Sequence, residues 1–164
     1  MTPPVPDAAI QHLAGLARGT YVLILRAPAA CVLQVGRLGT FALQPGWYAY
    51  VGSALSRAGL AGRIRHHLQT AARPHWHIDY LRQVAVLEEV WYVQSAMQYE
   101  HRWAAALCEL PGAACPVRRF GASDCRCPAH LAHFTDRPQV AAFNALVAGD
   151  LTPGERITVL RLAR

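Results

Sequence analysis

The chain has 164 residues, of which 53% are hydrophobic, so it has the size and composition of one ordinary domain with a substantial core. Its formal net charge of +6 and its pI of about 9.4 favour a polyanionic partner, and nucleic acid is the natural candidate. No apolar stretch approaches the ~20 residues needed to span a bilayer, and no signal peptide is recognisable, so we expect a cytoplasmic protein without a membrane segment.

Hydrophobic spacing and turn residues predict the helices and strands. In the first half we expect, in chain order, a short helix at 8–16, strands at 20–25, 31–35, 40–43 and 47–51, and a helix at 56–70. In the second half we expect a short helical turn at 75–81, a strand at 84–93, a helix at 98–110, an irregular stretch at 116–134, a helix at 138–148 and a last strand or tail at 152–164.

These elements predict an α+β fold with a small mixed, mainly antiparallel sheet flanked by helices. We expect a single domain over 1–164, with a core at 19–110, a Cys/His-containing extension at 111–148 and a tail or edge strand at 149–164. The five cysteines are odd in number, which favours reduced thiols over a disulfide framework. Arginine supplies all the strongly basic residues, a preference that suits phosphate binding but is better explained by a GC-rich genome.

Two short tyrosine-glycine motifs, Gly19-Thr20-Tyr21 and Tyr50-Val51-Gly52, lie at the ends of predicted strands. The helix after the second motif carries Arg63 and His67, which are four residues apart and therefore project from one helix face. A guanidinium and an imidazole on one face can reach the same phosphate, and cationic donors stabilise the charge that develops when a phosphodiester is cleaved. Glu100 begins a later helix, and its carboxylate is the kind of ligand that Mg²⁺ prefers.

This order of motifs resembles the GIY-YIG nuclease superfamily. In the resemblance, the two tripeptides stand at the two tyrosine-glycine motifs, Arg63 at the helical arginine, His67 at a position often held by histidine or tyrosine, and Glu100 at the metal-binding glutamate. The chain is most similar to the small Uri-type endonuclease branch, through GWYAYVGSA at 46–54, HWHIDYL at 75–81 and FGASDCRCPAHL at 120–131. The likeness covers about residues 19–134.

The resemblance implies an endonuclease, dependent on Mg²⁺ or Mn²⁺, that hydrolyses DNA by in-line attack of water, with a place in DNA repair. It implies that Tyr21 positions or deprotonates the water and that Tyr50 orients the phosphate or the water. A phenol of pKa ~10 serves as a base at neutral pH only where a nearby cation lowers that pKa. Residues expected to contact the substrate are Gly52, Ser53, Arg65 and His77.

The chain departs from the superfamily pattern at two places. Thr20 replaces the isoleucine of the first motif, which is a mild change at a strand position. The asparagine that some members place after the glutamate has no counterpart nearby, since the chain's asparagine is Asn144, and whether Ser123 or Asp124 substitutes is open. A module that binds nucleic acid without cutting it is therefore the alternative function, while oligomeric state is open.

A second group of reactive side chains, Cys125, Cys127 and His130, falls within one predicted loop. Two thiols and an imidazole this close can bind structural zinc, although Cys-x-Cys departs from the usual Cys-x-x-Cys spacing. The favoured alternative is a loop of buried thiols, and a zinc-stabilised interaction protein is a third function class. Candidates for a fourth zinc ligand are Cys108, Cys115, His75, His77 and His133.

Overall fold

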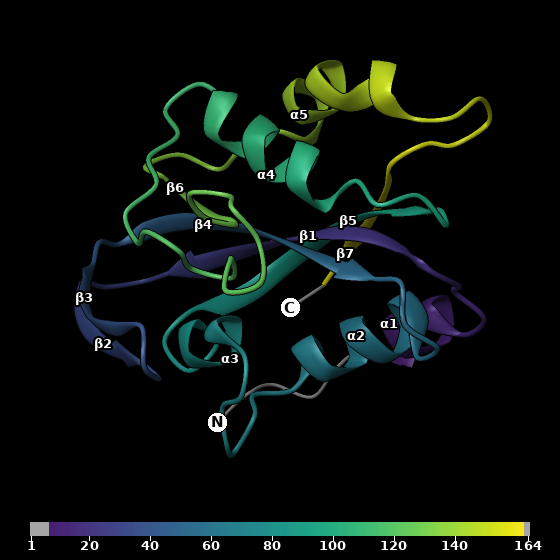
Figure 1. The fold of residues 1–164 in the computed structure, drawn as a ribbon. Helices are drawn as coiled ribbons and strands as arrows, with labels where there is room; N and C mark the ends of the chain where they lie inside the picture. Colours follow the sequence, from purple (N-terminus) through teal and green to yellow (C-terminus); the bar gives the residue numbers. More distant parts are fainter. Residues whose placement is uncertain (1–6, 163–164) are drawn as a thin grey trace.

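In the computed structural model, which describes residues 7–162, a five-stranded sheet lies between two layers of helices (Figure 1). Its strands run in the order β6-β4-β1-β5-β7, and all neighbouring strands are antiparallel. The strand bounds are β1 Gly19–Ala27, β4 Gly46–Ala54, β5 Val86–Gln94, β6 Leu131–Phe134 and β7 Thr158–Arg161. A separate hairpin pairs β2, Cys31–Val35, with β3, Gly39–Leu43. The predicted α+β fold class is confirmed.

The helices cover both faces of the sheet (Figure 1). One face carries α1, Asp7–Leu13, α2, Gly59–Leu68, and α3, His77–Leu81. The opposite face carries α4, Glu100–Glu109, and α5, Val140–Val147, which a 3₁₀ turn at Ala148–Asp150 follows. Within the described part of the chain, no helix combines the length and hydropathy needed to cross a bilayer.

Two hydrophobic clusters hold the layers together, and β1 contributes to both. Its residues alternate, so Tyr21 and Leu23 pack with α2 and α3, whereas Val22 and Ile24 pack with α4 and α5. Nearly every residue of β1 is buried because the strand is central and is covered on both faces. Tyr48 and Tyr50 lie in the same cluster as Tyr21, as their spacing in one strand predicts.

Two elements near the C-terminus define both edges of the sheet. The stretch predicted as irregular at 116–134 ends in β6, a four-residue strand that pairs with Trp47–Tyr50 of β4. The segment at 152–164, expected as a strand or tail, contains β7, which pairs with β5. Residues 163–164 lie outside the described part.

Candidate functional site

The two tyrosine-glycine motifs are direct neighbours across β1 and β4. In the antiparallel register Tyr21 faces Gly52 and Leu23 faces Tyr50. The Tyr21 phenol lies against the α-carbon of Gly52, so closely that a side chain at position 52 would overlap it. Gly19 is similarly enclosed, by the Val93 carbonyl and the Leu60 side chain. Close packing therefore requires both glycines, Gly52 against the Tyr21 ring and Gly19 against Val93 and Leu60.

We predict that Gly52→Ala destabilises the fold by about 1–3 kcal/mol, because the added methyl group must displace the Tyr21 ring from a packed position. Urea unfolding at neutral pH measures the loss. Gly149→Ala is the matched control, since nothing lies near a methyl group there. Equal stability of Gly52→Ala and the wild type would contradict the described packing.

His67 is the hydrogen-bond partner of the Tyr21 phenol. The Tyr21 hydroxyl and His67 Nε2 lie 2.8 Å apart, and both residues are buried. Burial lowers the pKa of His67 to about 3, with His66 and Arg63 adding to the decrease and Asp79 opposing it. His67 is therefore neutral at physiological pH. The His67 imidazole thus holds the phenol, and Arg63 is the cation four residues before it on α2.

The phenols of Tyr21 and Tyr50 are also held in their neutral form. Burial raises the pKa of Tyr21 well above its ordinary value, and nearby Tyr50 raises it further. Burial and the charge of Glu100 raise the pKa of Tyr50. Arg63 lowers both pKa values, but it does not outweigh burial. Tyr21 is thus a neutral hydrogen-bonding phenol in this structure.

The neutral, buried His67 makes stability depend on pH. An imidazole titrates at about 6.5 in the unfolded chain and at about 3 in the fold, so protons bind preferentially to the unfolded state between these values. The contribution of neutral His67 to the free energy of unfolding is complete above pH 6.5. We predict that about 2 kcal/mol of this contribution is lost as the pH falls to 5. Urea unfolding between pH 7 and 5 measures it.

The matched variants for this pH effect are His67→Gln and His75→Gln. The first removes the buried imidazole and is expected to reduce the pH dependence; it does not abolish it, because burial also lowers the pKa of His77. The second changes an exposed side chain and is expected to keep the wild-type dependence. If the unfolding free energy of His67→Gln depended on pH as strongly as that of the wild type, the neutral assignment of His67 would be contradicted.

Arg63 is held over the indole of Trp76. Its guanidinium carbon lies 4.1 Å from the ring centroid, a cation–π contact that fixes a long and flexible side chain. Its charge lowers the pKa of both Tyr21 and Tyr50. Arg65 is exposed on another face of α2. Of the two helical arginines, Arg63 is therefore the one that faces the phenols.

Asp79 organises the start of α3, which presents Trp76. Its Oδ2 accepts hydrogen bonds from the backbone NH groups of His75 and Trp76 at 2.9 and 3.0 Å, and its Oδ1 contacts His66 Nε2 at 2.7 Å. Burial raises the pKa of Asp79, but the hydrogen bonds from His75, His66 and Trp76 outweigh it and lower the pKa overall. Asp79 is therefore an ionised, fully engaged carboxylate that supports the indole under Arg63.

Glu100 approaches the phenols from the other helical layer. It is the first residue of α4, and its charge raises the pKa of both Tyr21 and Tyr50. Its Oε1 lies 3.4 Å from Nδ1 of His130, a buried residue whose carbonyl accepts the NH of Val51 in β4. Glu100 therefore lies beside the residue that directly precedes β6.

Glu109, the other carboxylate of α4, lies at the opposite end of the helix from Glu100. Its Oε1 is 3.3 Å from Arg102, and its side chain is half exposed. About nine residues separate it from Glu100, which corresponds to roughly 13 Å along the helix. Ser123 and Asp124, considered as substitutes for the missing asparagine, are exposed in the loop before β6.

The residues expected to contact substrate divide into two groups. Gly52 and Ser53 lie at the end of β4 beside Tyr21, with Ser53 partly exposed. His77 instead fastens the loop before β6 to α3, because its Nδ1 accepts the NH of Gly121 at 2.9 Å. Gly121 in turn contacts the ring of Tyr50. His77 thus holds the loop segment at Gly121 that packs against the Tyr50 ring.

The Cys/His group of the loop gains a member from α4. Potential ligand atoms of His101, Cys125, Cys127 and His130 all lie within 4.8 Å of one another. His101 was not among the predicted fourth ligands. Of those candidates, Cys108 and Cys115 adjoin each other, and Nε2 of His133 lies 3.0 Å from the Pro45 carbonyl. The site thus consists of two clusters: the tyrosine cluster of Tyr21, Tyr50, Arg63, His67 and Glu100, and the Cys/His cluster of His101, Cys125, Cys127 and His130. His66 and Asp79, which adjoin the first cluster, and His101 in the second were not assigned from the sequence.

Comparison with known proteins gives a family. A family model for a domain of unknown function, DUF123, matches residues 20–151. The chain belongs to the DUF123 family. No curated protein and no solved structure matches it. The matched segment contains every residue assigned to the two clusters, so both clusters are parts of the DUF123 domain itself.

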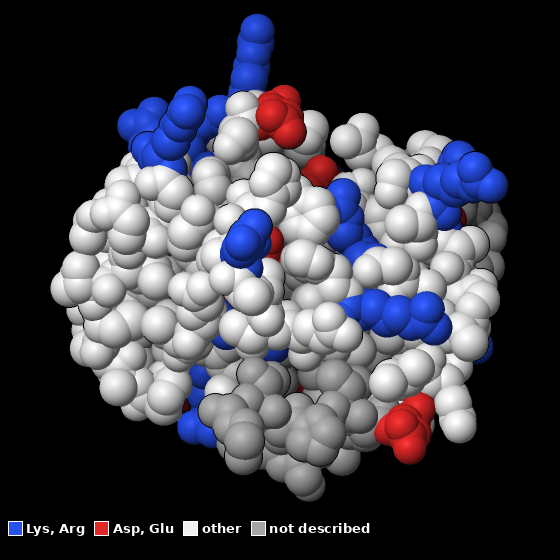
Figure 2. Space-filling view, turned by 90° about the horizontal axis from the view of Figure 1, so that it is seen from below, with Lys and Arg blue, Asp and Glu red and all other residues white. Residues whose placement is uncertain are grey.

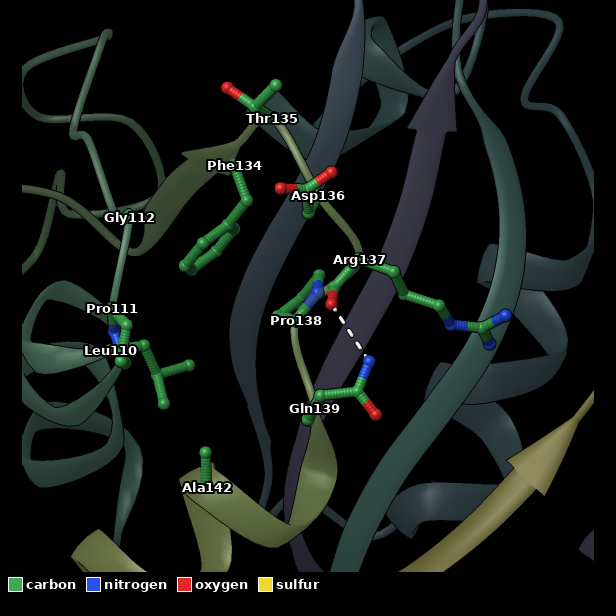
Figure 3. A pocket seen from close by; sticks show the side chains of 10 residues that line it. All are labelled: Leu110, Pro111, Gly112, Phe134, Thr135, Asp136, Arg137, Pro138, Gln139 and Ala142. Atoms are coloured by element: carbon green, nitrogen blue, oxygen red, sulfur yellow. Dashed lines mark hydrogen bonds between the residues drawn. The ribbon is translucent and has the colours of Figure 1, made fainter.

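A pocket of the DUF123 domain lies away from both clusters. It has a volume of about 330 Å³ and lies between the end of α4, the end of β6 and the start of α5 (Figure 3). Figure 3 shows Arg137 extending away from the pocket and Gln139 turned back toward the Arg137 carbonyl, which it meets at 3.1 Å. No residue assigned to the two clusters lines it, so the pocket adds nothing to the chemistry of the site.

The DUF123 domain also carries positive charge on its α1 to α3 side. Figure 2 shows basic side chains spread over this face, with fewer acidic ones among them. They form separate groups instead of one continuous band. The face agrees in sign with the formal net charge of +6.

Proposed function

We propose that this DUF123 domain is a Mg²⁺-dependent endonuclease of the GIY-YIG type that hydrolyses phosphodiester bonds in DNA. The observation that carries the proposal is the convergence of two neutral phenols, a buried imidazole, a fixed guanidinium and a carboxylate. They come from β1, β4, α2 and α4, and they are Tyr21, Tyr50, Arg63, His67 and Glu100. The positively charged face supports a polyanionic substrate.

The donor set fits a hydrated Mg²⁺ at Glu100. The carboxylates of Glu100 and Asp79 both raise the pKa of Tyr21. Both oxygens of Asp79 are already engaged, by His66, His75 and Trp76. Glu100 has one oxygen near His130 and keeps the other for a metal. Mg²⁺ retains most of its waters and commonly uses one or two protein carboxylates. When bound, the ion would neutralise charge on the phosphate and on the departing 3′ oxygen.

Tyr21 and His67 position the attacking water in this proposal. When the imidazole carries its proton on Nδ1, the phenol donates to Nε2 and its oxygen keeps a lone pair for a water hydrogen. A pKa of about 3 makes His67 a weak base, so the pair orients the water and does not remove its proton. Water forms a bond to phosphorus as the bond to the 3′ oxygen breaks; the water loses a proton to solvent and the 3′ oxygen gains one.

Arg63 and Tyr50 act on the phosphate. The guanidinium offers a bidentate fork to two phosphoryl oxygens, and its stacking on Trp76 limits the conformational entropy lost on binding. Tyr50 keeps its proton because burial and Glu100 raise its pKa, so it serves as a hydrogen-bond donor. The pair thereby stabilises charge on the transferring group without a covalent intermediate.

The test is cleavage of supercoiled plasmid and of branched duplexes in the presence of Mg²⁺ or Mn²⁺, with EDTA as the blank. The proposal expects nicking that requires the metal. The second candidate function, a non-cleaving DNA-binding module, is motivated by the missing asparagine after Glu100. Salt-dependent binding without cleavage under either metal would support that alternative and overturn the nuclease proposal.

A further inference from the structure

We infer that the DUF123 domain binds one structural Zn²⁺ through His101, Cys125, Cys127 and His130. The ligands come from two segments: His101 is the second residue of α4, and the other three lie in the loop that leads into β6. Two thiolates and two imidazoles form a donor set typical of tetrahedral zinc. The site does not depend on nuclease activity.

The four ligand atoms are close to tetrahedral spacing. Zn–S bonds of ~2.3 Å and Zn–N bonds of ~2.0 Å place the ligand atoms of a tetrahedron roughly 3.3–3.8 Å apart. Cys125 Sγ lies 3.3 Å from His130 Nε2, and all four ligand atoms lie within 4.8 Å of one another. Shifts of about one ångström in side chains would complete the site. The exposed His101 is the member best placed to make such a shift.

Arg119 holds the cysteine loop in shape. Its guanidinium donates to the carbonyls of Cys125 and Cys127 at 2.6 and 3.1 Å. Its own NH donates to the Pro128 carbonyl at 2.6 Å, and its φ of 68° lies in the left-handed region that arginine rarely adopts. The loop thus adopts a strained backbone whose contacts fix both cysteines of the Cys-x-Cys segment.

His130 is oriented as zinc-binding histidines usually are. Its Nε2 faces Cys125 and its Nδ1 faces Oε1 of Glu100 at 3.4 Å, while the ring is 2% exposed. Nδ1 has no hydrogen-bond partner within the described residues, so Glu100 is the nearest acceptor for its proton. A carboxylate behind a metal-bound imidazole fixes its tautomer and its orientation.

This arrangement links the zinc site to the proposed active site. Zinc at Nε2 leaves the proton of His130 on Nδ1, where it points at Glu100. His101 in the ligand set also fastens the first turn of α4, which carries Glu100. The ion would therefore position the proposed Mg²⁺ ligand, a consequence that rests on the proposed function, although zinc binding itself does not.

Metal analysis of the purified full chain tests the site directly. We expect about one zinc per chain, and replacement by Co²⁺ is expected to give the thiolate charge-transfer and visible bands of a tetrahedral S₂N₂ site. His101→Ala and Cys127→Ser are expected to lose the metal, whereas the double variant Cys108→Ser/Cys115→Ser is expected to retain it. Circular dichroism of each variant verifies folding.

Each outcome decides the inference without reference to cleavage. A wild-type chain that contains no zinc and does not take up Zn²⁺ or Co²⁺ overturns the site. Full zinc in His101→Ala overturns the ligand from α4. A wild type with zinc but without nuclease activity supports the site and removes the proposed function, so the two failures are distinguishable. The Co²⁺ spectrum of the wild type needs no variant to fold.

Discussion

Glu100→Gln is expected to lower the rate of DNA cleavage by on the order of 10³-fold, which corresponds to about 4 kcal/mol of transition-state stabilisation. The substitution removes the negative charge that attracts Mg²⁺ and keeps the shape of the side chain. The amide has nearly the same size as the carboxylate beside Nδ1 of His130, so packing at the start of α4 is retained. Single-turnover nicking of a radiolabelled branched duplex measures the effect.

The control for this variant is Glu109→Gln, which makes the same change at the other end of α4, where the carboxylate binds Arg102. It is expected to cleave at the wild-type rate. DNA affinity of Glu100→Gln, measured without metal, is expected to equal or exceed that of the wild type, because a negative charge beside the phosphate has been removed. Cleavage by Glu100→Gln within a few-fold of wild type would rule out its role as a metal ligand.

Arg63→Ala is expected to lower the cleavage rate by about 10²–10³-fold, since it removes a fixed cation from the transferring phosphate. Arg63→Lys is expected to recover only part of the rate, because an ammonium group neither stacks on Trp76 as a plane nor binds two oxygens as a fork. Arg37→Ala, which changes an exposed arginine in the β2–β3 turn, is the control. Single-turnover rates at saturating DNA separate this effect from binding.

The dependence on salt distinguishes two roles for Arg63. A residue that only attracts DNA would change affinity and its salt dependence and leave the rate at saturation unchanged. A residue that stabilises the transition state changes the rate at saturation and leaves affinity nearly constant. The account predicts the second pattern for Arg63→Ala, and the first pattern would contradict it.

Local signals were sufficient to predict most of the helices and strands. Aliphatic and β-branched runs predict β1 and β4, and the three- and four-residue spacing of Leu60, Ile64 and Leu68 predicts α2. The hairpin at β2 and β3 follows from its glycine turn. These features depend on residues near one another in sequence, where periodicity is informative.

Features that depend on long-range contacts were not predictable. β6 has only four residues, and it becomes a strand because β4 offers a free edge for pairing. His101 joins Cys125 and Cys127 only because the start of α4 meets the loop before β6. The neutral state of His67 follows from burial that the sequence of α2 alone does not specify.

The central claim is that Tyr21, Tyr50, Arg63, His67 and Glu100 form one Mg²⁺-dependent phosphodiester-cleaving site. The most direct test is the single-turnover cleavage rate of wild type, Glu100→Gln and Glu109→Gln, measured side by side on plasmid, duplex, single-stranded and branched DNA with Mg²⁺. The account predicts metal-dependent cleavage of at least one substrate that is lost in Glu100→Gln and retained in Glu109→Gln. Cleavage that survives Glu100→Gln, or its absence from every substrate in the wild type, would contradict the claim.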